Sequence, residues 1–212
     1  MSSQAHIITF LRHGESVGNR DNLFQGQHDF PLTETGRAQA QALAERWRSE
    51  GVLFDQCITS PLLRARETAE IISSALGLPL ENDPEWMEIH NGLLAGLSEH
   101  EASERYPRPD FMTPYTRFGR TGESRWELYL RAGRCIQKLI ERPVGRCLVV
   151  AHGAILNMAM YAMLSIPPQA DFTGPRFHFD NTTFTTLGYE PENHNWRLLE
   201  FDNRSHWKDG QR

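Results

Sequence analysis

The chain has 212 residues, of which 39% are apolar and 23% are charged, and its formal net charge is −5. This length fits one α/β domain with an ample core and does not require a second domain. The composition argues against disorder. The negative charge argues against general binding to nucleic acid or to an anionic membrane, so any attraction for an anion must be local.

Three further features bear on location. The N-terminal residues lack a basic segment followed by a long apolar stretch, so we expect no secretory signal. The most apolar helical segment, residues 154–166, is too short to span a membrane and contains Asn157. The three cysteines, Cys57, Cys135 and Cys147, show no metal-ligand spacing. We therefore expect reduced core cysteines and a cytoplasmic protein.

Strand and helix patterns alternate along the chain. In chain order they predict a strand at 7–11, a helix at 33–47, a strand at 54–59, a helix that ends at Leu76, irregular structure at 88–123, a helix at 123–141 and a strand at 147–151. Ser60 and Pro61 are expected to open the helix that ends at Leu76. Residues 177–189 and 196–201 predict a hairpin, because polar and apolar residues alternate in both.

This alternation predicts one fold class. It is a three-layer α/β/α fold with a mostly parallel central sheet, because buried apolar strands that alternate with helices are typical of such sheets. A C-terminal hairpin extends the sheet, and a small cap region at about residues 90–125 covers the site. We expect a single domain over residues 1–212.

An apolar segment ends in His-Gly at two places, in ITFLRHGES (residues 8–16) and in LVVAHGAIL (residues 148–156). His13 and His152 each stand where a predicted strand stops, and open α/β sheets bind ligands outside the carboxyl ends of their strands. Gly14 and Gly153 allow the backbone to turn there and to approach a ligand. The two histidines are therefore expected to face one pocket.

Three chemistries could use paired histidines. A metal site would need further ligands, and the other histidines show no zinc-type spacing. Arg12, directly before His13, is a permanent cation that disfavours a metal ion and favours an anion. Serine-based hydrolysis would need a Gly-x-Ser-x-Gly segment, which the chain lacks. The remaining chemistry is a histidine nucleophile that attacks a phosphate held by arginines, and Arg64, expected in the first turn of its helix, suits that task.

Several short motifs occur in a fixed order: LRHGES, Asn19, Gln25-Gly26, Asp29, PLTETG, SPLLRARET, Glu88-x-x-x-Gly92-x-x-x-Gly96, TGES and VAHG. Together they resemble the histidine phosphatase superfamily, also called phosphoglycerate mutase-like. The resemblance extends from Ile7 to about Leu164, and NTTFTTL resembles the ending of the family's sequences.

The resemblance implies that His13 attacks phosphorus to form a phosphohistidine, while Arg12, Arg64 and His152 hold the phosphate oxygens. It implies that Glu88 is the general acid and base, a role that needs a raised carboxyl pKa. Further contacts with phosphate or substrate are expected from Asn19, Gln25, Gly26 and Gly153. No metal and no organic cofactor are expected, because the cationic side chains replace a metal ion.

Departures from the mutases of this family favour a phosphatase. Those mutases have an asparagine where this chain has Ala154, and a tandem arginine pair where Arg117 and Arg120 are separated. They have Arg-His-Tyr-Gly where this chain has Ile-His-Asn-Gly at residues 89–92. We therefore favour a phosphoric monoester hydrolase. A cofactor-dependent phosphoglycerate mutase is the alternative.

A non-catalytic phospholigand-binding protein is the second alternative, although such a protein would not need His13 and Glu88 together. The cap, from His90 to Arg125, is expected to cover the phosphate pocket. In it, His90 and Arg117 are expected to contact a small-molecule phosphomonoester whose identity the sequence leaves open. Exposed aromatic residues such as Trp126 or Trp207 could serve a homodimer contact.

Overall fold

The computed structural model describes residues 5–207. Six strands form one sheet in the order β3-β2-β4-β1-β5-β6. They are β1 (His6–Arg12), β2 (Gln56–Thr59), β3 (Leu80–Asn82), β4 (Arg146–Ala151), β5 (Phe184–Glu190) and β6 (Asn195–Asn203). β1 to β4 pair in parallel, whereas β5 runs antiparallel to both β1 and β6. The predicted mostly parallel sheet and the C-terminal hairpin are confirmed.

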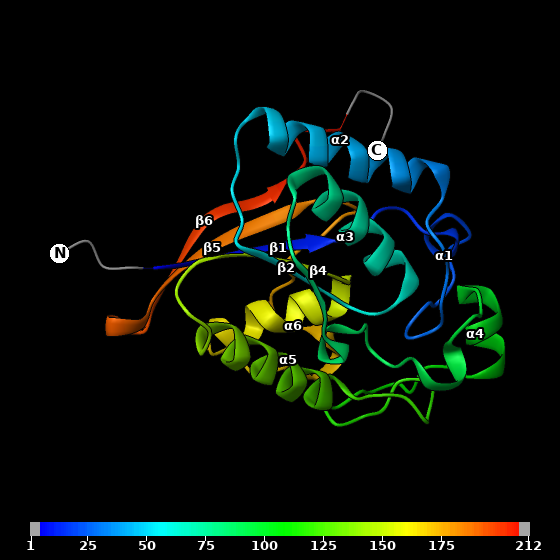
Figure 1. Ribbon diagram of the computed structural model, residues 1–212. Coiled ribbons are helices and arrows are strands. Elements are labelled where there is room, and N and C mark those ends of the chain that lie inside the picture. The colour runs from blue at the N-terminus through cyan, green and yellow to red at the C-terminus, as the bar shows by residue number, and fades with distance from the viewer. Residues whose placement is uncertain (1–4, 208–212) are drawn as a thin grey trace.

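Helices cover both faces of this sheet. The α-helices are α1 (Val17–Arg20), α2 (Glu34–Ser49), α3 (Leu63–Leu76), α4 (Glu99–Arg105), α5 (Arg125–Ile140) and α6 (Gly153–Met163). α2 and α3 lie on one face, and α5 and α6 on the other (Figure 1). The predicted three-layer α/β/α fold is therefore confirmed.

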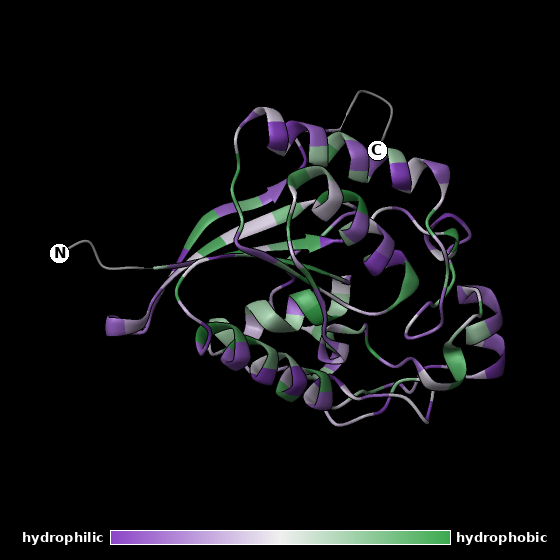
Figure 2. Cartoon of the chain, in the orientation of Figure 1, coloured by the Kyte–Doolittle hydropathy of each residue, from purple (hydrophilic) through white to green (hydrophobic). Residues whose placement is uncertain are grey.

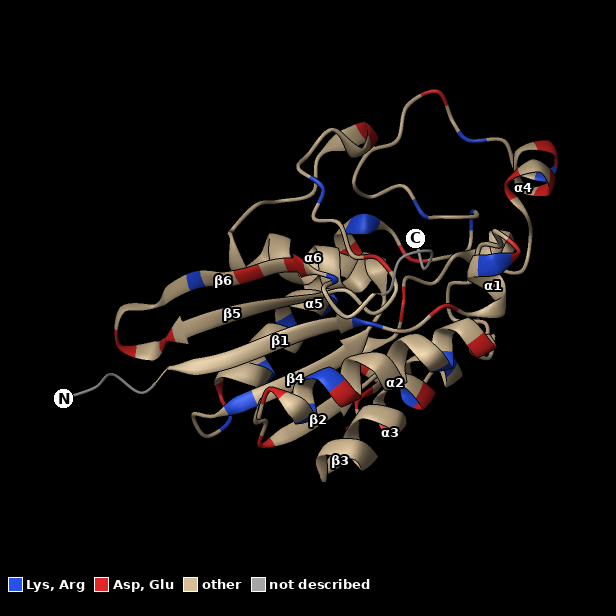
Figure 3. Ribbon diagram, turned by 90° about the horizontal axis from the view of Figure 1, so that it is seen from above, with Lys and Arg blue, Asp and Glu red and all other residues tan. Residues whose placement is uncertain are grey.

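Hydropathy follows these layers. Apolar residues concentrate on the strands and on the inner faces of the helices, while α2 and α5 present polar residues outward (Figure 2). Acidic and basic residues are interspersed on α2 and α4 (Figure 3). Within residues 5–207, no helix has both the length and the apolar character that a bilayer span requires.

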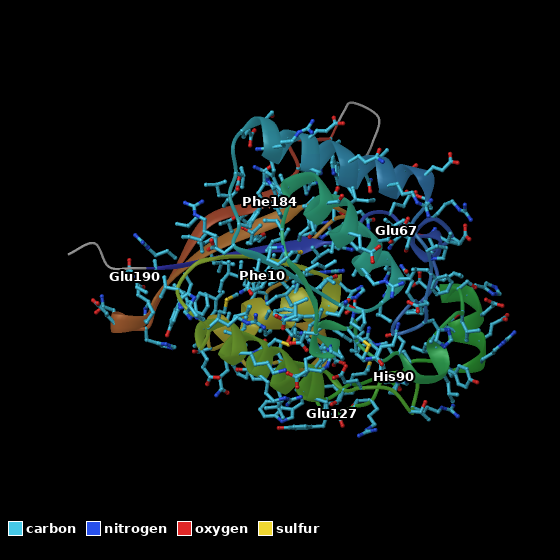
Figure 4. The ribbon with its side chains drawn as sticks, in the orientation of Figure 1. Phe10, Glu67, His90, Glu127, Phe184 and Glu190 are labelled. Atoms are coloured by element: carbon cyan, nitrogen blue, oxygen red, sulfur yellow. The ribbon has the colours of Figure 1, made fainter. Side chains whose placement is uncertain are left out.

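The central strands β1 and β4 are mostly apolar, and both of their faces are buried. On β1, Phe10 joins the core beneath α5 and α6, whereas its neighbour Leu11 joins the core beneath α2 and α3. Val149 and Val150 of β4 divide in the same way. Figure 4 shows Phe10 in the middle of the molecule. This two-sided burial is typical of parallel sheets and fixes where β1 and β4 end.

The start of α3 differs from the prediction. The helix begins at Leu63 after the cap residue Leu62, which makes no side-chain capping bond. Ser60 lies before this cap, so the prediction that Ser60 caps the helix is wrong. The physical reason is that the first helical hydrogen bond runs from the Arg66 N–H to the Leu62 oxygen, so the Ser60 oxygen meets only the N–H of the cap residue Leu62, at 3.3 Å. The helix ends as expected at Gly77, whose φ of 68° places it in the left-handed region.

The segment between Glu88 and α5 is largely irregular, as expected, and α4 is its one α-helix among the described residues. Two aromatic residues near this segment and the C-terminus are less exposed than expected. Trp126 stacks against Tyr115 and Tyr129, and the indole N–H of Trp207 donates to Thr182 Oγ1 at 3.1 Å. Both tryptophans are half-buried, and the homodimer contact stays a prediction.

The loop after β1 passes very close to the first turn of α2. A Cβ atom on Gly36 would lie 2.0 Å from the backbone oxygen of Glu15, and a Cβ atom on Gly14 would lie 2.5 Å from the oxygen of Gly36. Thr33 caps α2 by accepting from the Gly36 N–H at 3.0 Å. Two glycines therefore let this helix support the loop that carries His13.

Replacing Gly36 tests this close approach. We expect Gly36→Ala to lower the free energy of unfolding by about 1–3 kcal/mol, because the added methyl group meets backbone atoms that cannot move aside. Gly133→Ala is the matched control, because a Cβ atom on Gly133 in α5 meets nothing within 4 Å. It should stabilise the protein by up to about 1 kcal/mol. Urea unfolding measures both changes, and equal stability of the two variants would contradict the prediction.

Candidate active site

Adjacent parallel strands bring the two His-Gly segments together. β1 and β4 pair with Arg12 opposite Ala151, and the His13 N–H donates to the Ala151 oxygen at 3.0 Å. The rings of His13 and His152 are both buried, with centroids 5.1 Å apart. The structure thus brings the two histidines into one site, as the sequence predicted.

Two contacts assign the proton on the His13 ring. Nδ1 lies 2.7 Å from the backbone oxygen of Gly14, which can only accept, so Nδ1 carries the hydrogen. Arg64 Nε donates to His13 Nε2 at 3.2 Å, so Nε2 presents a lone pair. Burial, and then the charges of Arg64 and Arg12, lower the pKa of His13 well below its usual value. The ring is therefore neutral at neutral pH.

Arg64 is oriented by backbone oxygens of the loop that follows α1. Its Nη1 donates to the His28 oxygen at 2.9 Å and its Nη2 to the Gly26 oxygen at 2.7 Å. Burial lowers the pKa of Arg64 to about 10, which leaves the group charged at neutral pH. Thr68, one turn further along α3, donates to the Arg64 oxygen and accepts from the Gly14 N–H. Thr68 therefore ties Arg64 to the loop of His13.

Two buried nitrogen atoms in this site lack a protein partner. Arg12 Nη1 donates to the Phe179 oxygen at 2.7 Å, but Arg12 Nε has no hydrogen-bond partner among residues 5–207. The same holds for His152 Nδ1, whereas His152 Nε2 contacts Ser60. Burial, followed by the charge of Arg64, lowers the pKa of His152 well below its usual value. Buried polar atoms are rarely left unpaired, so both indicate the place of a ligand.

Glu88 is held at the N-terminus of α6. Its Oε1 accepts from the N–H groups of Ile89 at 2.9 Å and Ile155 at 3.2 Å, and its Oε2 accepts from Ala154 at 3.1 Å. Three N–H groups, two of them from the first turn of α6, thus donate to this carboxylate. Because α6 begins at Gly153, directly after His152, this carboxylate lies beside the second His-Gly segment.

Arg131 of α5 holds the backbone that precedes and includes Glu88. Its Nη1 donates to the oxygens of Glu85 and Met87, at 2.6 Å each, and its Nη2 donates to the oxygen of Glu88 at 3.3 Å. The same guanidinium forms two hydrogen bonds, of 2.7 and 2.9 Å, with the Glu123 carboxylate. This arginine therefore joins the Glu88 segment to α5.

Asn19 and Gln25 lie on the loop that follows His13. Asn19 Oδ1 accepts from the Ser16 N–H and from Asn181 Nδ2, both at 3.2 Å, and Gln25 Oε1 accepts from the Ser16 hydroxyl at 2.7 Å. Asn181 Nδ2 also donates to the His13 oxygen at 2.9 Å. The oxygens of both amides are thus engaged by protein, so a ligand would be met by their NH₂ groups.

The two expected glycine contacts differ in what they offer. The backbone oxygen of Gly26 accepts from Arg64 and therefore positions the guanidinium group that is expected to bind phosphate. Gly153 is the first residue of α6, and a Cβ atom there would lie 3.9 Å from Arg12 Nε. Contact of Asn19, Gln25, Gly26 and Gly153 with a substrate stays a prediction.

His90 and Arg117 line a different hollow. They border an open cavity of about 550 Å³ together with Gln27, Thr121, Gly122, Glu123, Glu127, Leu130, Arg131 and Arg134. None of the five residues expected to be catalytic is among those that line it. Arg117 pairs with Glu127, and Figure 4 shows His90 and Glu127 on the same side of the molecule. Contact of His90 or Arg117 with a substrate stays a prediction.

Other nucleophiles and metal ligands are not gathered here. Within residues 5–207, no group of three or more His, Cys, Asp or Glu side chains is arranged to hold a metal ion. Burial raises the pKa of the Cys57 and Cys147 thiols to about 12, so neither supplies a thiolate nucleophile.

Sequence reasoning missed four residues that support the site: Ser60, Thr68, Arg131 and Asn181. Only Thr68 carried a local signal, because it stands four residues after Arg64 and so on the same face of α3. Ser60, Arg131 and Asn181 act across chain separations that no local pattern reveals.

Together, the fold and the site define a class of protein in which two buried histidines and two arginines meet at the carboxyl edge of a mostly parallel sheet. Residues 8–203 match the family model of the histidine phosphatase superfamily (branch 1). The chain therefore belongs to the histidine phosphatase superfamily, and the resemblance seen in its motifs is confirmed.

Similar proteins carry two kinds of name. The chain is 35% identical over 191 residues to the probable phosphoglycerate mutase GpmB of Yersinia enterocolitica, covering 86% of this chain and 85% of that protein. YhfR of Bacillus stearothermophilus superposes with a TM-score of 0.83 at 28% identity, over 95% of this chain and 98% of that one. A mycobacterial glucosyl-3-phosphoglycerate phosphatase superposes with a TM-score of 0.77 at 25% identity, over 94% and 100%.

The neutral histidines make stability depend on pH. The folded-state pKa values of His13 and His152 lie well below the 6.5 of an unfolded chain, so below pH 6.5 the unfolded chain takes up protons that the folded protein excludes. The contribution of these two histidines to the free energy of unfolding should therefore be complete above pH 6.5. On acidification the free energy of unfolding should decrease, by up to about 1.4 kcal/mol per pH unit for each histidine. Urea unfolding of His152→Asn should show a shallower decline between pH 6.5 and 5. His100→Asn, at an exposed site, should keep the slope of the wild type, and a wild-type slope in His152→Asn would contradict the assignment.

Removing Arg131 should loosen the Glu88 segment. In Arg131→Met we expect amide hydrogen exchange at Ile89 and Ile155 to accelerate by about tenfold or more, because their N–H groups bond to a carboxylate that is no longer fixed. Arg134→Met is the matched control, because Arg134 lies on the same helix but is half-exposed and pairs only with the Glu85 carboxylate. Equal exchange in the two variants would show that Arg131 does not position Glu88.

Proposed function

We propose that this protein is a phosphatase that hydrolyses a small-molecule phosphomonoester through a phosphohistidine formed on His13. The observation that supports this proposal most directly is the tautomer of the His13 ring. Its Nδ1–H is fixed on the Gly14 oxygen, and its Nε2 lone pair lies among cationic groups. A neutral imidazole in this orientation is ready to attack an electrophile that carries negative charge.

In the first step His13 Nε2 forms a bond to phosphorus while the bond from phosphorus to the leaving oxygen breaks. The non-bridging oxygens need donors that strengthen as charge develops on them. Arg12 Nε and His152 Nδ1, which lack protein partners among residues 5–207, supply two such donors. Arg64 supplies a third donor, and its Nε donates to His13 Nε2 in this structure.

Glu88 moves the protons in both steps. Phosphomonoesters have a second pKa of about 6, so a bound monoanion brings a proton that Glu88 passes to the leaving oxygen. In the second step the Glu88 carboxylate takes a proton from water. The water oxygen bonds to phosphorus, the bond to Nε2 breaks, and inorganic phosphate leaves.

The mutase alternative draws support from the names of the sequence relatives. Features of the cap favour hydrolysis instead. Arg117 is paired with Glu127, and the Arg120 guanidinium lies 5.5 Å from the centre of the Tyr106 ring. The two arginines therefore do not form a joint clamp for a substrate carboxylate. The structural neighbours include a protein named as a phosphatase, which agrees with hydrolysis.

We further propose that the reaction needs no metal ion, because Arg12 and Arg64 supply the positive charge that a metal would otherwise provide, and the neutral His152 adds a hydrogen-bond donor. Cytoplasmic location stays part of this proposal.

The deciding assay is phosphate release from p-nitrophenyl phosphate and a panel of phosphomonoesters in the presence of EDTA. We expect release by the wild type and its loss in His13→Ala, because that variant has no nucleophile. Glu88→Gln should lower kcat by about 10²- to 10⁴-fold, because proton transfer is lost. His100→Ala, on the exposed face of α4, controls for the loss of a histidine.

Release that persists in His13→Ala would contradict the phosphohistidine mechanism. An absence of release from every substrate, combined with interconversion of phosphoglycerates primed by 2,3-bisphosphoglycerate, would establish the mutase instead. Binding of phosphomonoesters without either activity would point to the phospholigand-binding protein.

A further inference from the structure

Ser60 is a fully buried serine at the carboxyl end of β2, and its hydroxyl meets the ring of His152. Its Oγ lies 2.8 Å from His152 Nε2 and accepts a weaker bond, at 3.3 Å, from the Leu62 N–H. The two residues are 92 positions apart in the chain. They meet because β2 and β4 are neighbouring parallel strands.

The Ser60 hydroxyl has one proton to donate. Among residues 5–207, Nε2 of His152 is the one acceptor within hydrogen-bond distance of it. If Nε2 carried a hydrogen instead, the buried serine proton would have no acceptor. Leaving a buried donor unpaired costs about 1–3 kcal/mol. Donation from Ser60 to Nε2 satisfies both residues and places the ring hydrogen on Nδ1.

The surroundings of Nδ1, on the other side of the His152 ring, independently indicate the same tautomer. His152 Nδ1 is buried without a protein partner among residues 5–207, and it belongs to a site that also holds Arg12, Arg64 and the Nε2 lone pair of His13. A lone pair on Nδ1 would repel an oxyanion in that site, whereas an N–H would donate to it. Protonation of both ring nitrogens, which would make the imidazole cationic, is disfavoured there, because two guanidinium groups are already present.

We propose that Ser60 is a positioning residue that fixes the tautomer of His152, so that His152 Nδ1–H donates to a phosphoryl oxygen. The inference rests on the proposed function for its role in catalysis, since the bond to the phosphoryl group would hold it for attack by His13. Ser60 acts only through His152. The tautomer itself is a property of the protein without substrate.

The assignment predicts that both site histidines carry their hydrogen on Nδ1, although different groups impose it. For His13 the backbone oxygen of Gly14 accepts from Nδ1. For His152 a side-chain hydroxyl donates to Nε2, and the Nδ1–H is left free for the ligand. Replacing Ser60 should therefore release the tautomer of His152 and leave that of His13 unchanged.

The first test needs no variant. Long-range ¹H–¹⁵N NMR spectra of the ¹⁵N-labelled full chain, without phosphate at neutral pH, report which ring nitrogen carries hydrogen, and the signals absent from His152→Asn identify His152. We expect a protonated Nδ1 and a bare Nε2 for His152. Inorganic phosphate should shift the Nδ1 signal. A hydrogen found on Nε2 in the wild type overturns the proposal.

Variants test whether Ser60 is the cause. In Ser60→Ala we expect mixed tautomers of His152 and about tenfold weaker binding of inorganic phosphate, the effect of about one lost hydrogen bond. Ser60→Thr keeps the hydroxyl and should restore the Nδ1–H tautomer. Ser73→Ala removes a buried serine from α3 and should alter neither measurement. An unchanged tautomer and an unchanged phosphate affinity in folded Ser60→Ala would overturn the proposal.

These outcomes separate the inference from the proposed function. An Nδ1–H tautomer that depends on Ser60, in a protein that binds phosphate but hydrolyses no phosphomonoester, would sustain the inference and refute the phosphatase. Hydrolysis dependent on His13, in a protein whose His152 carries its hydrogen on Nε2, would sustain the phosphatase and refute the inference.

Discussion

The rest of this structure depends on two guanidinium groups, that of the buried Arg64 and that of the half-buried Arg12. Burial of a charge is costly unless polar groups surround it, and backbone oxygens perform this task for Arg12 and Arg64. The oxygens belong to Phe179, Gly26 and His28. Backbone oxygens orient a cation without neutralising it, and the ion pairs of residues 5–207 include neither arginine. The positive charge therefore remains available to an anion, and together with burial, the larger cause, it keeps the pKa values of the neighbouring imidazoles low.

The order of the strands determines the order of the groups in the site. β4 lies between β2 and β1, and the residues after these strands are Ser60, His152 and His13. His152 accordingly meets Ser60 on one side and the ring of His13 on the other. Because parallel strands end at the same edge of the sheet, three loops that are distant in sequence converge there. The N-terminus of α6, which follows β4 directly, then adds the amides that hold Glu88.

The parts of this arrangement that sequence could predict are those with a local pattern. His13 and His152 each end a short apolar strand, and Arg64 stands near the start of a helix, so their shared edge followed from the alternation of strands and helices. Ser60 was misread because Ser-Pro before a helix is a typical cap, and only the distant His152 shows its other use. Arg131 resembles an ordinary helical arginine until Glu85, Met87 and Glu88 pack beside α5.

In the proposed reaction the groups around His13 act on the phosphoryl group of the substrate. A phosphohistidine is common to hydrolysis and to mutase chemistry, and the two reactions differ only in whether water or a retained alcohol accepts the phosphoryl group. That choice depends on whether the cap can keep the alcohol in place while water is excluded. In this chain the cap arginines are already occupied, Arg117 by Glu127 and Arg120 by the face of Tyr106. In the proposed reaction a departing alcohol therefore finds little to retain it, and water takes its place.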